Sequence, residues 1–145
     1  MKTLPGIKKV EFTQISELIL YPKKIIAAGD TISAIGNWHD LEIVGLASCK
    51  TTNEHSDNGI VYTTIVNGTL IDHDRFTPLE ALPVFFHVYR ITDIQNNKYL
   101  IGTYKMPAPE IKFNYVNDAD PAGQRKIEFE ITWISTLPPT LLMLL

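Results

Sequence analysis

The chain has 145 residues, of which 45% are hydrophobic and 20% are charged, and its formal net charge is −3. This composition excludes a wholly disordered chain, and the absence of a basic stripe argues against nucleic-acid binding through phosphates. The length fits a single domain, residues 1–145. Cys49 is the only cysteine, so an internal disulfide is excluded as well.

The distribution of apolar residues bears on the compartment. The segment after Lys2 lacks the continuous apolar core of a secretory signal. No apolar run reaches the roughly 18–20 residues that a membrane-spanning helix needs. We therefore expect a cytoplasmic protein without a membrane partner.

The first third of the chain predicts short extended segments. Ile7–Phe12 follows a Pro-Gly pair and reads as a strand, and residues 14–21 indicate a helical turn or a loop that ends before a proline. A second strand is expected over Lys24–Ala28, and a third begins near Thr31 and stops at Gly36.

The centre of the sequence predicts a long β-hairpin. Its arms, Leu41–Thr52 and Gly59–Leu70, are rich in β-branched and aromatic residues and flank the polar segment Asn53–Asn58. Gly45 indicates a bulge or a close backbone approach in the first arm. The dipeptide Asn67–Gly68 indicates a bend or turn near the end of the second arm.

One short helix and a second hairpin follow. Thr77–Pro83 has an N-cap threonine, a proline at the first helical position and a glutamate at the capping-box position. Val84–Thr92 and Lys98–Tyr104 are the arms of the hairpin, around the turn Asp93–Asn97. In Val84–Tyr89 the odd and the even positions both carry apolar residues, which predicts a strand covered on both faces.

The last strands are the most regular. Glu110–Val116 is one, and Gln124–Ser135 places four large apolar residues on every second position, which predicts a core strand. The alternating residues are Ile127, Phe129, Ile131 and Trp133. With about seven to nine strands and frequent turn signals, the chain is expected to be all-β, an antiparallel sandwich or barrel with one long hairpin and at most one short helix.

Residues 136–145 form an apolar tail after two prolines. Five apolar residues left in water would favour association. Two interpretations stay open, because the tail either folds back onto its own sheet or docks on a neighbouring subunit. The candidate contact residues are Leu141, Leu142, Met143, Leu144 and Leu145.

Residue clusters with catalytic or ligand-binding chemistry are few. Asp72, His73 and Asp74 are adjacent, but in a strand the histidine would point away from the two carboxylates, so neither a metal site nor catalysis is expected there. Cys49 precedes His55 and Asp57 without a nucleophile signature. The loop Asp118–Asp120 lacks the calcium-loop pattern. We expect no metal, no cofactor and no enzymatic activity.

Two stretches carry a family resemblance. The opening Pro5–Phe12 and the order of strand, polar turn and "Tyr-Leu-Ile-Gly" strand over Tyr89–Thr103 resemble small uncharacterised structural proteins of prophages in Bacteroides-type bacteria. The resemblance implies a tail or head–tail component that works by assembly with itself and with other phage structural proteins, in the virion as well as in the cytoplasm. It implies no catalytic residue.

The residues themselves are compatible with that role. The hairpin tip, with His55 and Asp57, joins the C-terminal tail as a candidate interface of a homo-oligomer. The alternative is a small-molecule or carbohydrate-binding sandwich, with Trp38 and His39 as its platform. Other aromatic residues that would serve such a platform are Tyr62, Tyr89 and Trp133. A small β-barrel enzyme using the cluster at residues 72–74 ranks last.

Overall fold

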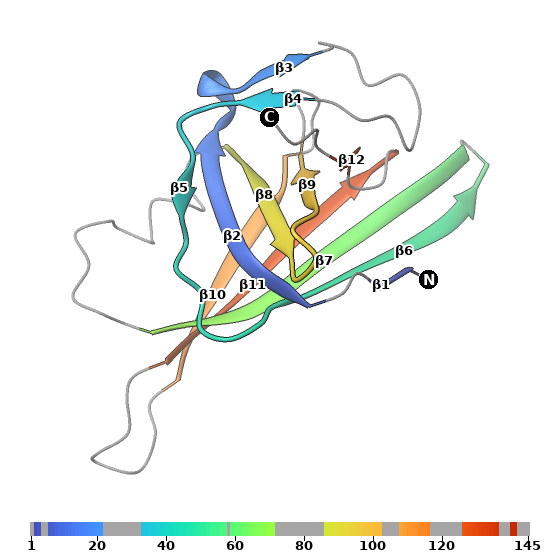
Figure 1. Ribbon diagram of the computed structural model, residues 1–145. Helices are drawn as coiled ribbons and strands as arrows, with labels where there is room; N and C mark the ends of the chain where they lie inside the picture. Colours follow the sequence, from blue (N-terminus) through green and yellow to red (C-terminus); the bar gives the residue numbers. More distant parts are fainter. Residues whose placement is uncertain are drawn as a thin grey trace.

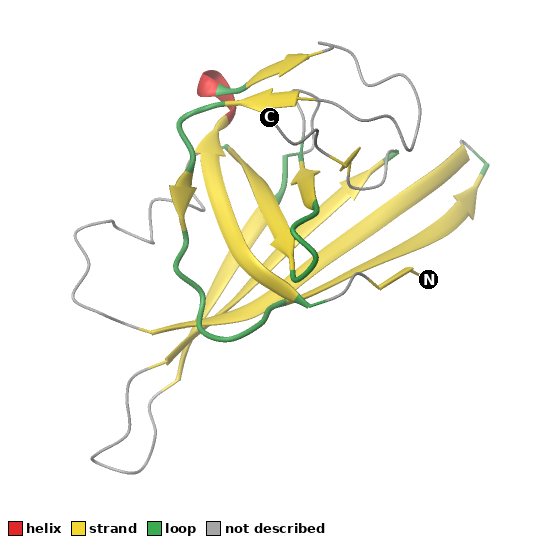
Figure 2. Cartoon of the chain, in the orientation of Figure 1, coloured by secondary structure: helices red, strands yellow, loops and turns green. Residues whose placement is uncertain are grey.

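The fold is an all-β sandwich, as the alternating patterns predicted (Figures 1 and 2). The structure is a computed structural model that describes residues 2–3, 6–21, 33–57, 59–71, 86–102, 108–116, 126–136 and 140–141. The strands of these residues form two separate five-stranded antiparallel sheets and a small two-stranded sheet rather than a closed barrel.

The first sheet contains the longest strands and has the order β1-β6-β7-β11-β10. These strands are β1 (Lys2–Thr3), β6 (Ser48–Ser56), β7 (Gly59–Ile71), β11 (Lys126–Ser135) and β10 (Glu110–Val116). In β11 the predicted alternation is confirmed, because Phe129 and Trp133 are buried while Glu128 and Glu130 are exposed.

The second sheet crosses in front of the first in Figure 1 and has the order β12-β9-β8-β2-β5. Its strands are β12 (Thr140–Leu141), β9 (Lys98–Ile101), β8 (His87–Asp93), β2 (Ile7–Gln14) and β5 (His39–Asp40). The small sheet pairs β3 (Ile19–Tyr21) with β4 (Ser33–Ile35). Within residues 14–21, expected to be a helical turn or a loop, the 3-10 turn η1 (Ile15–Glu17) is confirmed, but Gln14 ends β2 and Ile19–Tyr21 is a strand.

The main core lies between the two large sheets. Val10, Tyr89 and Ile91 of the second sheet belong to one buried cluster with the inward residues of β7 and β11. On the other face of β8, Val88 packs with Leu18 and forms a smaller cluster. Strand β8 is thus buried on both faces, as predicted for residues 87–89. Of the rest of the predicted segment Val84–Tyr89, Phe86 precedes β8 and is 61% exposed, and residues 84–85 lie outside the described residues.

The first arm of the long hairpin differs from the prediction at both ends. Residues 41–47 form a loop with isolated bridges at Ile43 and Ala47, because Glu42 and Gly45 adopt positive φ angles of 59° and 67° that interrupt an extended strand. The strand itself, β6, continues through Ser56, so most of the predicted polar turn is extended backbone.

The dipeptide Asn67–Gly68 is not a bend or turn, because β7 continues through it. Gly68 pairs with Phe129 of β11, and a Cβ atom on Gly68 would lie 2.6 Å from Cε1 of that ring. The glycine therefore makes room for an aromatic ring across the strand pair.

The second hairpin follows the prediction closely. The Asp93 carboxylate accepts hydrogen bonds from the backbone N–H groups of Gln95 and Asn97, both at 2.9 Å, and Asn96 has a positive φ of 66°. A buried aspartate thus fixes the turn through its side chain. The predicted strand Lys24–Ala28 and the predicted helix Thr77–Pro83 lie outside the described residues.

Candidate functional site

The β6–β7 hairpin extends beyond the packed part of the sandwich (Figure 1). In β6 the buried residue is Cys49, and in β7 burial begins at Thr64 and continues with Val66 and Leu70. From Asn53 to Asp57 every residue is exposed. We call residues 53–57 and 59–62 the hairpin tip.

Neighbouring strands support only the base of the hairpin. β1 pairs with β6 at Lys50 and Thr51, and the ladder between β11 and β7 ends at the pair Ser135 and Tyr62. Among the described residues, no strand pairs with β6 beyond Thr51 on its outer side. An unpaired strand edge is a template to which another chain can add a strand.

The two strands of the tip are held together by pairing with each other, since none of its described residues is buried. His55 pairs with Ile60 and Ser56 with Gly59 across the turn, and the Ser56 hydroxyl donates a 3.0 Å hydrogen bond to the Gly59 carbonyl. At the base, the hydroxyls of Thr51 and Thr64 lie 3.1 Å apart. Because Ile60 stays 39% exposed, the tip presents an aliphatic side chain to solvent.

The three groups Cys49, His55 and Asp57 are not brought together. The thiol lies in the core, and the other two side chains lie near the far end of β6, six residues or roughly 20 Å along the strand from it. Burial raises the pKa of the Cys49 thiol from 9.0 to about 12. A neutral buried thiol is a poor nucleophile, so this geometry offers no activated cysteine.

Trp38 packs in the smaller apolar cluster on the outer face of the second sheet. The Arg90 guanidinium carbon lies 4.6 Å from the centre of its ring, so one face of the indole is covered. The indole nitrogen is buried and has no acceptor among the described residues. His39 is exposed on β5, with its ring centre 5.5 Å from that of Phe12.

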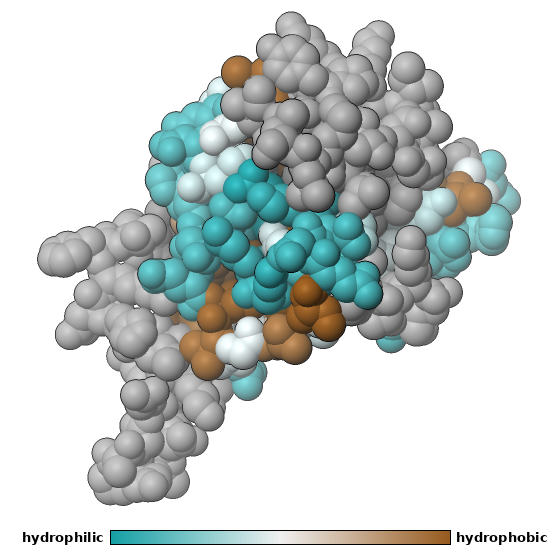
Figure 3. All heavy atoms as spheres, viewed as in Figure 1, coloured by the Kyte–Doolittle hydropathy of each residue, from teal (hydrophilic) through white to brown (hydrophobic). Residues whose placement is uncertain are grey.

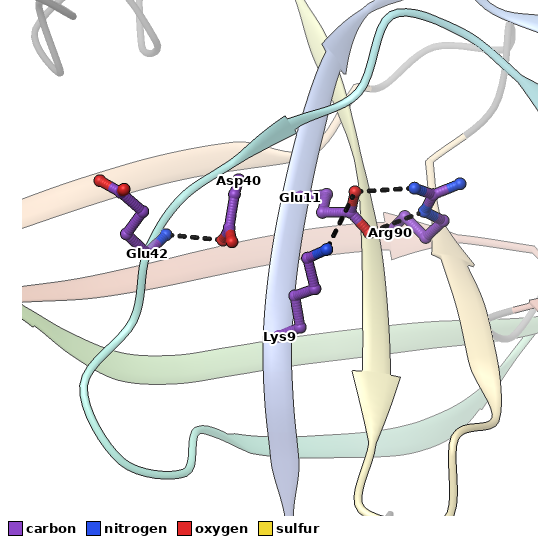
Figure 4. A network of polar contacts seen from close by, with 5 residues as sticks. All are labelled: Lys9, Glu11, Asp40, Glu42 and Arg90. Atoms are coloured by element: carbon purple, nitrogen blue, oxygen red, sulfur yellow. Dashed lines mark hydrogen bonds and ion pairs between the residues drawn. The ribbon is translucent and has the colours of Figure 1, made fainter.

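Arg90 also belongs to a polar network that the sequence analysis missed (Figure 4). It donates two hydrogen bonds to the Glu11 carboxylate, at 3.0 and 2.7 Å, and Lys9 lies 3.8 Å from the same carboxylate. Glu11 is only 6% exposed. Glu11 and Arg90 are opposite each other in the β2–β8 pairing, so no local motif could have revealed this pair.

Two further candidate clusters come from the sequence. The clusters Asp72–Asp74 and Asp118–Asp120 lie outside the described residues. Within the described part of the chain, no group of three or more histidine, cysteine, aspartate or glutamate residues could hold a metal ion. The helical content described there is the single 3-10 turn, far short of a membrane-crossing helix.

The beginning of the C-terminal tail pairs within the chain. Thr140 and Leu141 form β12, which lies antiparallel to Leu100 and Tyr99 of β9. This pairing is of the kind expected if the tail folds back onto its own sheet. Residues 142–145 lie outside the described residues, so docking of Leu142, Met143, Leu144 and Leu145 on a neighbour stays a prediction.

Comparison with known proteins gives no assignment. No family model matches the chain, and no curated protein or solved structure matches it.

Proposed function

We propose that this chain is a non-enzymatic structural protein that assembles with copies of itself through the β6–β7 hairpin. Tail or head–tail components of a phage, which the sequence resembles, are the class of protein that would work in this way. In that setting other phage structural proteins would be further partners.

The observation that carries the proposal is the length of the hairpin relative to the sandwich. Its tip contains nine described residues, none of them buried, and the Tyr62–Ser135 pair ends its contact with β11. A two-stranded ribbon without a core is marginally stable by itself. An ordered ribbon of this kind gains stability when a partner covers it, either on a face or along the open edge of β6.

Assembly is favoured over the ligand-binding alternative by the position of Trp38. A sugar or a base would stack on an open aromatic face, whereas the guanidinium of Arg90 lies over this indole and is itself held by Glu11. Binding there would require displacement of a partly buried ion pair.

The test is to shorten the hairpin without changing its register. Ser56 and Gly59 flank the natural turn, and Glu54 and Val61 form a pair of the same kind two residues further from the turn on each arm. Replacing residues 55–60 by Asn-Gly, a sequence suited to two-residue turns, closes the shortened ribbon at that pair. It leaves the Tyr62–Ser135 pairing intact.

Sedimentation velocity over a concentration series is the measurement. We expect the unaltered chain to form oligomers and the shortened chain to remain monomeric, with the same melting temperature for the monomer. An unaltered chain that stays monomeric up to its solubility limit would refute the proposal. Oligomers of unchanged size in the shortened variant would show that assembly uses another surface.

A further inference from the structure

A second exposed surface lies at the other end of β6. The exposed side chains there are Val44, Leu46 and Ile94, which we call the end patch, with exposures of 44%, 62% and 54%. Figure 3 shows an apolar area below the centre of the view, where the 41–47 loop and the β8–β9 turn lie in Figure 1. Exposed apolar side chains gathered in this way mark interaction surfaces.

The backbone joins the three side chains of the end patch into one surface. Gly6 lies between the two loops, because the N–H of Ile94 donates to the Gly6 carbonyl at 3.0 Å. Leu46 lies against Gly6 so closely that a Cβ atom there would be 2.8 Å from its Cδ1. The N–H of Val44 donates to the Thr69 carbonyl at 2.8 Å, which fixes the loop on β7.

Lysines border the end patch on the side of the second sheet. An irregularity in the β2–β8 register falls between Ile7 and Lys9, and the ammonium of Lys8 there donates to the Asn96 side chain in the β8–β9 turn. Lys9 and Lys98 are both paired with Thr92, so they lie in the same cross-strand row. Hydrophilic side chains adjoin the apolar area in Figure 3.

Among the described residues, the exposed acidic residues near this end lie on another side, and Asp93 is buried in the β8–β9 turn. Asp40 and Glu42 are linked by a 2.8 Å hydrogen bond from the Glu42 N–H and lie across β2 from Lys9 (Figure 4). Glu11 is engaged by Arg90 and by Lys9. In the part of the chain that the structure describes, the exposed border of the end patch that faces the second sheet is therefore basic.

The hairpin tip has the complementary chemistry. Ile60 is an exposed aliphatic side chain, and the exposed Glu54 and Asp57 are acidic. Neither lysine nor arginine occurs among the described residues from 52 to 63. Ile60 lies opposite His55 on one face of the ribbon, whereas Glu54 lies opposite Val61 on the other face and Asp57 is in the turn. The tip as a whole is therefore acidic and carries one exposed aliphatic side chain, which matches apolar side chains bordered by ammonium groups in hydrophobicity and in charge.

A single copy cannot bring these two surfaces together. The end patch adjoins the start of β6, whereas Ile60 of the tip lies opposite His55, seven residues along β6 from Ser48 or roughly 23 Å at strand rise. We infer that the hairpin tip of one copy docks on the end patch of the next copy. Because two different surfaces meet, each copy keeps one of each free, and the association continues head to tail into a ring or a filament.

This inference rests on the proposed function, and complementation tests it. Leu46→Asp blocks the end patch and Ile60→Asp blocks the tip. Each variant should be monomeric at protein concentrations at which the unaltered chain is oligomeric, because its association constant should be lower by about tenfold or more. An equimolar mixture retains one intact tip and one intact end patch, so it should form a dimer of two different variants and nothing larger.

The matched control is Ile134→Asp, the same chemical change at a 50% exposed isoleucine on the outer face of the first sheet. It should assemble like the unaltered chain. If Ile60→Asp is monomeric while Leu46→Asp assembles normally, the tip docks elsewhere and this inference fails although the proposed function survives. If the mixture of the two blocked variants stays monomeric, the head-to-tail contact is refuted.

Charge reversal supplies an independent measurement. Glu54→Lys with Asp57→Lys should weaken assembly at low salt, and so should Lys8→Glu with Lys98→Glu. Uniting all four substitutions in one chain restores opposite charges across the contact and should restore assembly. Failure of the fourfold variant to assemble, while its melting temperature matches that of the unaltered chain, would contradict the proposed pairing of surfaces.

Discussion

The contact between Gly68 and Phe129 permits a sharp prediction about the core. In Gly68→Ala the new methyl carbon would lie 2.6 and 2.7 Å from two ring carbons and 3.0 Å from the Cβ of Ala47, where ordinary contacts are 3.4–4 Å. The ring is only 2% exposed, so it must shift by about 1 Å inside a close-packed core.

Two opposing effects decide the size of the loss. Overpacking of this kind costs about 1–3 kcal/mol, while replacing glycine by alanine within a strand gains about 0.5–1 kcal/mol of conformational free energy. We expect Gly68→Ala to lower the free energy of unfolding by about 1–2 kcal/mol. Phe129→Ala alone should lower it by about 3–5 kcal/mol through the cavity that it leaves.

The double variant tests the reasoning itself. With the ring removed, the methyl group of Gly68→Ala enters the cavity instead of a clash, so the combined loss should be about 1–2 kcal/mol smaller than the sum of the single losses. Urea unfolding followed by tryptophan fluorescence measures all three values, with the exposed neighbour Asn67→Ala as a control near zero. Strictly additive losses, or a stabilised Gly68→Ala, would refute the assigned contact.

Further predictions concern the buried ion pair and the buried thiol. Arg90→Met should lower the free energy of unfolding by about 3 kcal/mol, because it leaves the Glu11 carboxylate buried without its bidentate partner. The double variant Glu11→Leu with Arg90→Met should recover most of that loss. Equal losses for the single and the double variant in urea unfolding would contradict this expectation. Native Cys49 should resist alkylation at about pH 8 and react once the chain is unfolded, and rapid labelling of the folded protein would contradict its burial. Burial raises the pKa of this thiol in the folded chain from 9.0 to about 12, so its contribution to stability is complete below pH 9.0 and is lost as the pH rises toward 12. Over that range the free energy of unfolding should fall by about 1.4 kcal/mol per pH unit. Cys49→Ala should therefore show a shallower decline in the free energy of unfolding over that range, and an unchanged slope would contradict the shift.

Local periodicity in the sequence was enough to predict the all-β class and most strands that lie in the core. Gln124–Ser135 and Glu110–Val116 were predicted almost to the residue, because strands with one buried face alternate with a period of two. The turn after β8 was also predicted, since aspartate and asparagine form side-chain hydrogen bonds to nearby backbone groups. Each of these features depends on neighbours within a few residues.

Features that join distant residues could be decided only by the tertiary structure. The ion pair of Glu11 and Arg90 joins residues 79 positions apart, and the role of Gly68 depends on a ring in β11. The polar tip of the hairpin was predicted as a turn because its residues are polar, yet strand pairing keeps it extended. Its exposure depends on where β1 and β11 end, and the end patch depends on three segments meeting at Gly6. A one-dimensional pattern records which residues avoid water locally, whereas the places where two sheets stop covering each other are set by the packing of the whole chain.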